Sequence, residues 1–103
     1  MARPSRRVTW SPEALVDLEG IWQYYLGIAG PDTAEVIVSE IAQTASLLAD
    51  YPLAGRVRDE VRPKLRSIVA APYVLFYRVQ GTTPQIVRVL DGRQDTDNIF
   101  LIS

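Results

Sequence analysis

Residues 65–90, LRSIVAAPYVLFYRVQGTTPQIVRVL, decide the fold of this chain of 103 residues. They contain three runs rich in the residue types that favour strands, namely Leu65–Ala70, Tyr73–Val79 and Gln85–Leu90. Ala71-Pro72 and Gly81–Pro84 lie between the runs. Because links this short join antiparallel neighbours, the stretch predicts an antiparallel meander of three strands.

Two amphipathic helices are predicted before these strands. Ser11-Pro12-Glu13 supplies an N-cap, a proline for the first turn and an acid near the positive end of the helix dipole. The apolar positions that follow have helical spacing: Leu15, Leu18, Ile21, Trp22, Tyr25 and Leu26. A second helix is expected to start at Asp32 or Thr33 and to end at Tyr51-Pro52. Its apolar stripe is Ala34, Ile37, Val38, Ile41, Ala45 and Leu48.

The order of the predicted elements is β-α-α-β-β-β. Val8-Thr9-Trp10 is the first strand candidate, and Asp95 is expected to cap a short final helical turn that carries Ile99, Phe100 and Leu101. The order is typical of the α+β class, with a helical hairpin packed on one face of a small antiparallel sheet. The length corresponds to one domain, residues 1–103.

The composition argues against several kinds of function. The chain has no cysteine, and so no disulfide, zinc–thiolate site or thiol nucleophile. It also has no histidine, the commonest general base and transition-metal ligand. We therefore expect neither a classical hydrolase nor a metal or cofactor. The apolar runs are too short for a transmembrane helix, and no signal-peptide core follows the basic N-terminus, so we expect a cytoplasmic protein.

Charge is divided unequally along the chain, although the net charge is only −1. Residues 8–55 carry seven acids and no base, whereas residues 56–93 carry eight bases and three acids. One interpretation is that the second half presents a basic face to an acidic partner. The other is that the two halves complement each other within the fold.

The densest basic stretch is RVRDEVRPKLR, residues 56–66. Strand alternation places Lys64, Arg66 and Ile68 on one face of the first meander strand. Basic side chains on a sheet face are candidates for holding an acidic peptide or RNA phosphates, and an ordinary solvated edge is the alternative.

The stretch VRVLDGRQD, residues 87–95, turns abruptly from apolar to charged around Gly92. Arg93 is placed to clamp a carboxylate or a phosphate with two hydrogen bonds. Alternatively it pairs with Asp91, with Asp95 or with a helix C-terminus and has a structural role. The sequence leaves both possibilities open.

An ordered set of segments resembles the ParE branch of the ParE/RelE toxin superfamily. The set comprises Pro52–Arg56 (PLAGR), Arg66, Pro72–Val79 (PYVLFYRV) and Ile86–Asp95 (IVRVLDGRQD). The likeness extends from about Val8 to Phe100. It implies a small toxin of a type II toxin–antitoxin pair with a RelE/ParE-like fold, whose partner is a ParD-like antitoxin.

The superfamily implies two functions, and the residues distinguish them. RelE-like members cut mRNA on the ribosome with basic residues and a tyrosine near the C-terminus, whereas ParE-like members poison DNA gyrase. The nuclease branch has an arginine directly after the tyrosine of the middle strand, whereas here Val74 follows Tyr73. The catalytic tyrosine of the nuclease branch corresponds to a position near Ile99 or Phe100. Arg93 does match the arginine after the last strand, but RNA cleavage also requires an acid and a base that are missing at the matching positions.

We therefore expect a toxin without a catalytic site that inhibits DNA gyrase and is neutralised by an antitoxin. The alternatives are a RelE-like ribosome-dependent mRNA interferase and a non-toxic module that only binds the antitoxin. An antitoxin helix is expected to place apolar anchors in a groove and acids against arginines. The candidate residues for binding the antitoxin or the target are Arg58, Arg62, Lys64, Arg66, Arg78, Arg93 and Phe100.

Overall fold

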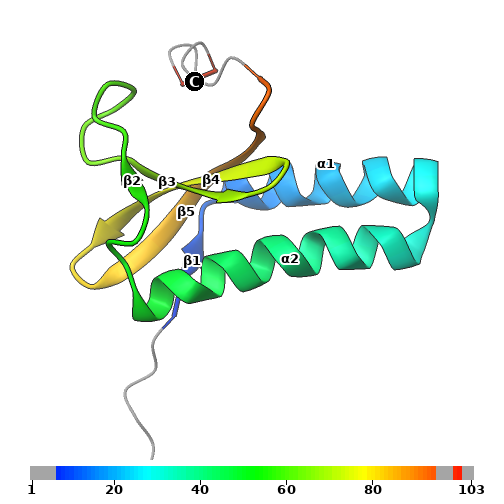
Figure 1. Cartoon of the computed structure of the whole chain (residues 1–103), viewed down its shortest axis with the longest axis horizontal. Helices are drawn as coiled ribbons and strands as arrows, with labels where there is room; N and C mark the ends of the chain where they lie inside the picture. Colours follow the sequence, from blue (N-terminus) through cyan, green and yellow to red (C-terminus); the bar gives the residue numbers. More distant parts are fainter. Residues whose placement is uncertain (1–6, 95–98, 101–103) are drawn as a thin grey trace, which may run out of the picture.

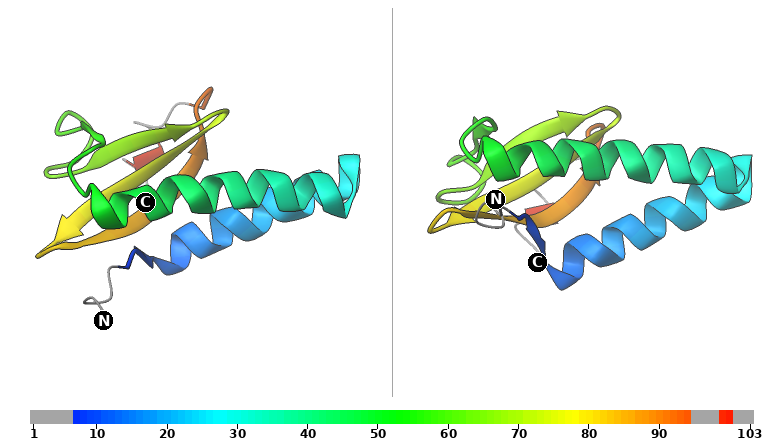
Figure 2. Two further views of the ribbon diagram at one scale, coloured as in Figure 1. Left: turned by 60° about the horizontal axis from the view of Figure 1, so that its bottom comes forward. Right: turned by 90° about the horizontal axis from the view of Figure 1, so that it is seen from below.

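The computed structural model describes residues 7–94 and 99–100. Its elements are β1 (Thr9–Trp10), α1 (Pro12–Ala29), α2 (Pro31–Asp50), β2 (Arg56–Val57), β3 (Arg66–Ala70), β4 (Tyr73–Gln80) and β5 (Thr83–Asp91). The two helices form an antiparallel hairpin on one side of a sheet, and the turn between them reaches beyond the sheet (Figure 1, Figure 2). The predicted α+β class is confirmed. Ile99 and Phe100 are helical, as expected, whereas Asp95 and Leu101 lie outside the described residues.

The sheet has five strands in the order β1-β5-β4-β3-β2. Strands β3, β4 and β5 form the predicted antiparallel meander. Two details differ from the small antiparallel sheet that was expected. β1 pairs with β5 in the parallel direction, and the extra strand β2 pairs with the start of β3. A strand of two residues shows no alternation in the sequence, which is why β2 was not predicted.

The helix ends follow from local residue chemistry. Ser11 caps α1, because its Oγ accepts a hydrogen bond from the N–H of Ala14 at 3.0 Å. Gly30 ends α1 and precedes Pro31, the first residue of α2. Its φ of +92° lies in a region that glycine adopts without a side-chain clash, so the chain reverses direction in a single residue.

The buried faces of the helices agree with the predicted stripes in α2 more closely than in α1. In α2 the buried residues all belong to the predicted stripe: Ala34, Ile41, Ala45 and Leu48. In α1 only Ala14 and Ile21 are buried, and Leu15 and Leu26 of the predicted stripe are exposed. Helix α1 packs against both α2 and strand β5. The face of α1 that these contacts cover does not include Leu15 or Leu26.

The sheet separates two apolar clusters. The larger lies between the helices and the sheet and includes Tyr73, Leu75 and Tyr77 of β4. The smaller lies on the other face and contains Leu65, Phe76, Leu90 and Phe100. Successive residues of a strand point to opposite faces, so β4 contributes to both clusters and is the central, doubly covered strand.

An ion pair next to a β-bulge holds α1 against β5. Phe76 lies opposite Arg88 and Tyr77 opposite Ile86, which leaves Val87 without a counterpart. Beyond the bulge, the Arg88 guanidinium contacts the Asp17 carboxylate of α1 through two hydrogen bonds, at 2.8 and 3.0 Å. The same carboxylate accepts the N–H of Val89 at 2.8 Å. Asp17 thus pairs with an edge amide that β1 is too short to reach.

Tyr77 of β4 holds the loop that follows α2. Its hydroxyl accepts a hydrogen bond from the Gly55 N–H and donates one to the Pro52 carbonyl, each at 2.8 Å. Arg66 of β3 adds hydrogen bonds to the carbonyls of Leu53, at 3.3 Å, and Gly55, at 2.9 Å. We call these contacts the Tyr77 latch, and they tie the end of the helical hairpin to the middle of the sheet.

Replacement of Gly55 by alanine should break the Tyr77 latch. A Cβ at Gly55 would lie 2.5 Å from the ring and hydroxyl of Tyr77 and 2.8 Å from the carbonyl oxygen of Ser67. The clash and the disturbed hydrogen bond are expected to lower the free energy of unfolding by about 2–4 kcal/mol, measured by urea unfolding.

Gly20→Ala in α1 is the matched control. Nothing lies within 4 Å of an added Cβ there, so the substitution should raise stability by about 1 kcal/mol through helix propensity. If Gly55→Ala is as stable as the wild type, the Tyr77 latch does not fix this loop.

Candidate functional site

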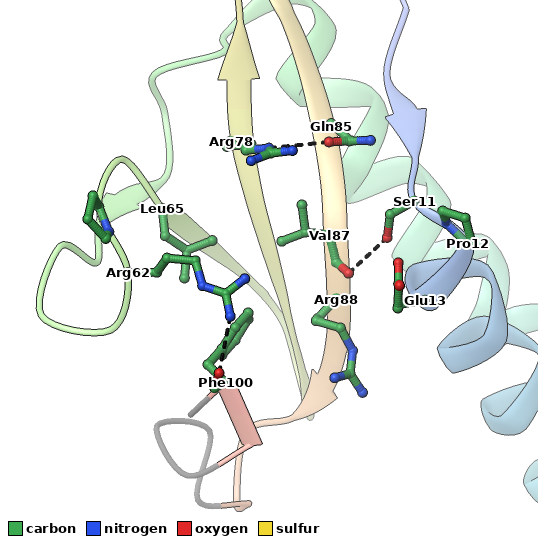
Figure 3. Close-up of a pocket in the computed structure, with 11 residues that line it drawn as sticks. Ser11, Pro12, Glu13, Arg62, Leu65, Arg78, Gln85, Val87, Arg88 and Phe100 are labelled. Atoms are coloured by element: carbon green, nitrogen blue, oxygen red, sulfur yellow. Dashed lines mark hydrogen bonds between the residues drawn. The ribbon is translucent and has the colours of Figure 1, made fainter. Parts of the chain in front are cut away.

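A groove of about 350 Å³ lies on the sheet face opposite the helical hairpin (Figure 3). Strand β5 runs along its middle, Arg62, Pro63 and Leu65 form one side, and the start of α1 forms the other. Its lining residues are Ser11, Pro12, Glu13, Arg62, Pro63, Leu65, Arg78, Gln85, Val87, Arg88 and Phe100. We call this site the basic groove, because it holds three arginines and one acid.

Arg62 and Phe100 form one wall of the basic groove. The Arg62 guanidinium donates a hydrogen bond to the Phe100 carbonyl at 3.1 Å and lies over the Phe100 ring, 5.0 Å from its centroid. The ring packs edge-on against Phe76 beneath it. Phe100 is buried, so it supports the wall and offers little of its own surface to a ligand.

Arg78 lies at the other end of the basic groove, where its Nε donates to the side-chain oxygen of Gln85 at 3.3 Å. Neither Arg62 nor Arg78 has a carboxylate within ion-pair distance among residues 7–94 and 99–100. Glu13 is the acid of the groove, and its charge acts on Arg88. The positive charge of Arg62 and Arg78 is therefore open to a ligand.

Arg88 lines the basic groove, but its charge is balanced from within the fold. The two hydrogen bonds that Arg88 donates to Asp17 raise the pKa of the Arg88 guanidinium, and burial opposes that effect to a smaller extent. Both side chains of this ion pair are largely buried, with relative exposures of 22% for Arg88 and 13% for Asp17. Such a pair sets the position of the strand edge and leaves little charge for a partner.

Arg93 does not belong to the basic groove. Its guanidinium forms two hydrogen bonds with Asp91, at 2.9 and 2.6 Å, and its N–H donates to Asp91 Oδ1 at 2.9 Å. These bonds lower the pKa of the Asp91 carboxyl to about 2. The pairing with Asp91 that the sequence left open is the one that forms.

The other predicted binding residues lie apart from the groove. Arg58 pairs with Glu60 at 2.7 Å, and the carbonyls of the Tyr77 latch hold Arg66. Lys64 was expected to share a strand face with Arg66, but β3 begins at Arg66. The tight turn closed by the hydrogen bond from Leu65 N–H to the Arg62 carbonyl occupies this position. Of the seven candidates, only Arg62, Arg78 and Phe100 line the basic groove.

Sequence reasoning missed Ser11, Glu13, Gln85, Val87 and Arg88 as groove residues. Arg88 gave a usable signal, since a charged residue inside an apolar strand needs a partner or a function. Gln85 and Val87 enter the groove through the register and the bulge of β5, and Ser11 and Glu13 enter it because the start of α1 lies beside that strand. A single sequence does not encode these placements in a readable way.

The tyrosines that could take part in proton transfer lie outside the basic groove. Burial raises the pKa of Tyr77, and burial together with a hydrogen bond to Tyr25 raises the pKa of Tyr73. Both hydroxyls therefore stay protonated at neutral pH. The described residues contain no cluster of three or more metal-ligating side chains and no helix long and apolar enough to cross a membrane.

The family model for the ParE toxin of the type II toxin–antitoxin system parDE matches residues 8–96. The chain belongs to the ParE toxin family. The resemblance seen in the sequence is thereby confirmed.

Known proteins agree with this assignment. Toxin ParE1 of Mycobacterium tuberculosis (strain H37Rv) is 40% identical over 94 residues, 90% of this chain and 96% of that protein. Toxin RelE2 of Caulobacter vibrioides is 34% identical over 83 residues, 81% of this chain and 91% of that protein. A solved structure described as the chromosomal ParDE TA system from P. aeruginosa superposes with a TM-score of 0.71 at 26% identity, covering 84% of this chain and 98% of that one.

The Asp91–Arg93 pair predicts a pH dependence. The pKa of Asp91 falls from 3.8 to about 2 on folding, so its contribution to stability is complete above about pH 4 and is lost as the pH falls towards 2. A titration of the Asp91 carboxyl carbon by NMR should have its midpoint near pH 2 in the wild type. In Arg93→Gln, the midpoint should move up towards 3.8, because the guanidinium is the main cause of the shift. Equal midpoints in the two proteins would show that the pair does not form in solution.

Proposed function

We propose that this protein is the toxin of a type II toxin–antitoxin pair, that a ParD-like antitoxin neutralises it by direct binding, and that its target is DNA gyrase. The observation that carries the proposal is the match of the ParE toxin model to residues 8–96, nearly all of the chain. The solved ParDE system from P. aeruginosa, with the same fold, supports the antitoxin as a partner.

The basic groove suits a segment of the antitoxin. Its apolar lining is the half-buried Val87, with the buried side chains of Leu65 and Phe100 beneath, and the unpaired charge comes from Arg62 and Arg78. An amphipathic segment with acids beside apolar anchors complements both features. The sequence-based expectation placed the acids of the antitoxin against Arg58, Arg62 or Arg66. The structure leaves only Arg62 of these for the antitoxin, because Arg58 and Arg66 form hydrogen bonds within the chain.

The chemistry of the site favours an inhibitor without a catalytic cycle. The basic groove offers cations to a phosphate, but RNA cleavage also needs a group that removes a proton from the 2′-hydroxyl. Among the described residues that line the groove, Glu13 has the only carboxylate, and its charge acts on Arg88. We therefore propose that the protein acts in the cytoplasm by binding its target rather than by cutting a substrate.

A second candidate function is ribosome-dependent cleavage of mRNA. It is favoured by the likeness to Toxin RelE2 and by the three arginines of the basic groove. Under this alternative, the purified protein cuts mRNA on ribosomes, and Arg62→Ala or Arg78→Ala abolishes the cleavage. A protein that arrests growth without cutting mRNA rules it out.

Inhibition of gyrase is tested with purified gyrase, ATP and plasmid. We expect the toxin to stop supercoiling and to trap linear DNA, and the antitoxin to restore supercoiling. The same assay with topoisomerase IV in place of gyrase shows whether the inhibition is specific to gyrase. If the toxin arrests growth but leaves gyrase unaffected, the gyrase proposal is wrong and the ribosome assay decides between the remaining functions.

Charge reversal in the basic groove tests whether the antitoxin binds there. Arg62→Glu combined with Arg78→Glu places two like charges against the acids of the antitoxin, and the dissociation constant should rise about tenfold to a hundredfold. Lys64→Glu is the matched control, since it makes one of the same charge changes outside the groove and should leave the affinity within about twofold. Isothermal titration calorimetry measures all three proteins. Unchanged affinity in the double variant would move the antitoxin away from the basic groove.

A further inference from the structure

On the helix side, the sheet continues past the end of α2. The hairpin stops at Asp50, and a depression of about 280 Å³ opens beyond it. We call this surface the β2 corner. It is lined by Leu53, Val57, Asp59, Lys64, Leu65, Arg66 and Val79. The basic groove lies on the opposite face of the sheet, and the buried Leu65 is a lining residue of both sites.

The apolar side chains of the β2 corner are exposed yet held in place. Leu53 is 66% exposed and Val57 is 47% exposed. Leu53 belongs to the loop of the Tyr77 latch, where four hydrogen bonds from Tyr77, Gly55 and Arg66 fix the backbone on either side of it. An apolar surface that is rigid before binding loses little conformational entropy when a partner covers it.

Strand β2 adds an open edge to this surface. It is the last strand of the sheet, and its only described neighbour is β3. The N–H of Arg58 donates to the Leu65 carbonyl at 2.8 Å, so by strand alternation the N–H and C=O of Val57 point outward. In the described part of the chain, neither group has a hydrogen-bond partner. They are free to pair with an added strand.

One unpaired cation lines the apolar depression. Lys64 is exposed and forms no ion pair within residues 7–94 and 99–100. Arg56 precedes Val57 in β2 and therefore points to the opposite face. Lys64 also has a φ of +65°, an unfavourable conformation for a residue with a Cβ, and the Asp59 carboxylate holds it there by accepting its N–H at 2.9 Å. The fold therefore keeps a strained lysine beside the exposed valine of an open edge.

From these features we propose that the β2 corner binds the protein target of the toxin through an extended segment that adds a strand to β2. The segment places alternate apolar side chains against Leu53, Val57 and Val79, and an acid of the segment meets Lys64. The inference rests on the proposed function, because it requires a protein target. It assigns the target and the antitoxin to opposite faces of the sheet.

The test separates toxicity from antitoxin binding. Leu53→Ser combined with Val57→Ser removes the apolar contact, and Lys64→Glu reverses a flanking charge. Val57→Pro removes the outward N–H without breaking a bond inside the sheet. Val69→Ser is the matched control, since Val69 is 66% exposed on the other face of β3 and lines none of the described depressions. Each protein is purified with the antitoxin, and its thermal unfolding and antitoxin affinity are measured beside growth arrest on induction.

For the three corner variants, we expect the inducer concentration that arrests growth to rise at least about tenfold. Their affinity for the antitoxin should stay within about twofold of the wild type, and their melting temperature should be unchanged. Val69→Ser should arrest growth like the wild type. Corner variants that remain folded and toxic would overturn the inference. So would a parallel loss of antitoxin affinity, which would assign the corner to the antitoxin. If the wild type itself arrests no growth, the proposed function fails first, and that result is distinct from either of these.

Discussion

The buried hydroxyl of Tyr77 is the contact on which the arrangement of the two layers depends. It lies on β4, the strand with apolar clusters on both faces, and reaches the backbone of the loop that leaves α2. A buried hydroxyl needs partners for both its donor and its acceptor capacity, and the loop provides one of each. This geometry fixes the distance between the end of the helical hairpin and the sheet. It also excludes any side chain at Gly55.

The basic residues of the second half divide into two groups by the partner that holds them. Arg88, Arg93 and Arg58 bind a carboxylate of the same chain, and Arg66 binds carbonyls of the Tyr77 latch. Arg62 and Arg78 also bond to neutral oxygens, but they line the basic groove and have no carboxylate partner within the described residues. Within the described residues, only Arg88 pairs with an acid of the first half, so the two halves complement each other through a single ion pair. That the other bases meet an acidic partner stays a prediction.

Much of the fold could be predicted from the sequence because its signals are local. Runs of branched and aromatic residues marked β3, β4 and β5, and Ser11-Pro12 marked the start of α1. The candidate site could not be predicted in the same way, because it depends on register. The bulge at Val87 brings Arg88 to Asp17, although 71 positions separate them in the chain. Similarly, the turn before β3 removes Lys64 from the strand face that alternation had assigned to it.

Both edge strands of the sheet are only two residues long, and this brevity has a consequence for the toxin when it is alone. Long open edges allow sheets of different molecules to join, which leads to aggregation. Here the outer side of β5 is closed by β1, Ser11 and Asp17, and β2 exposes the hydrogen-bonding groups of a single residue. Two hydrogen bonds are too few to hold an arbitrary strand. The brevity of β1 and β2 therefore limits pairing of these edges with the sheets of other molecules, and a partner strand needs matching side chains as well.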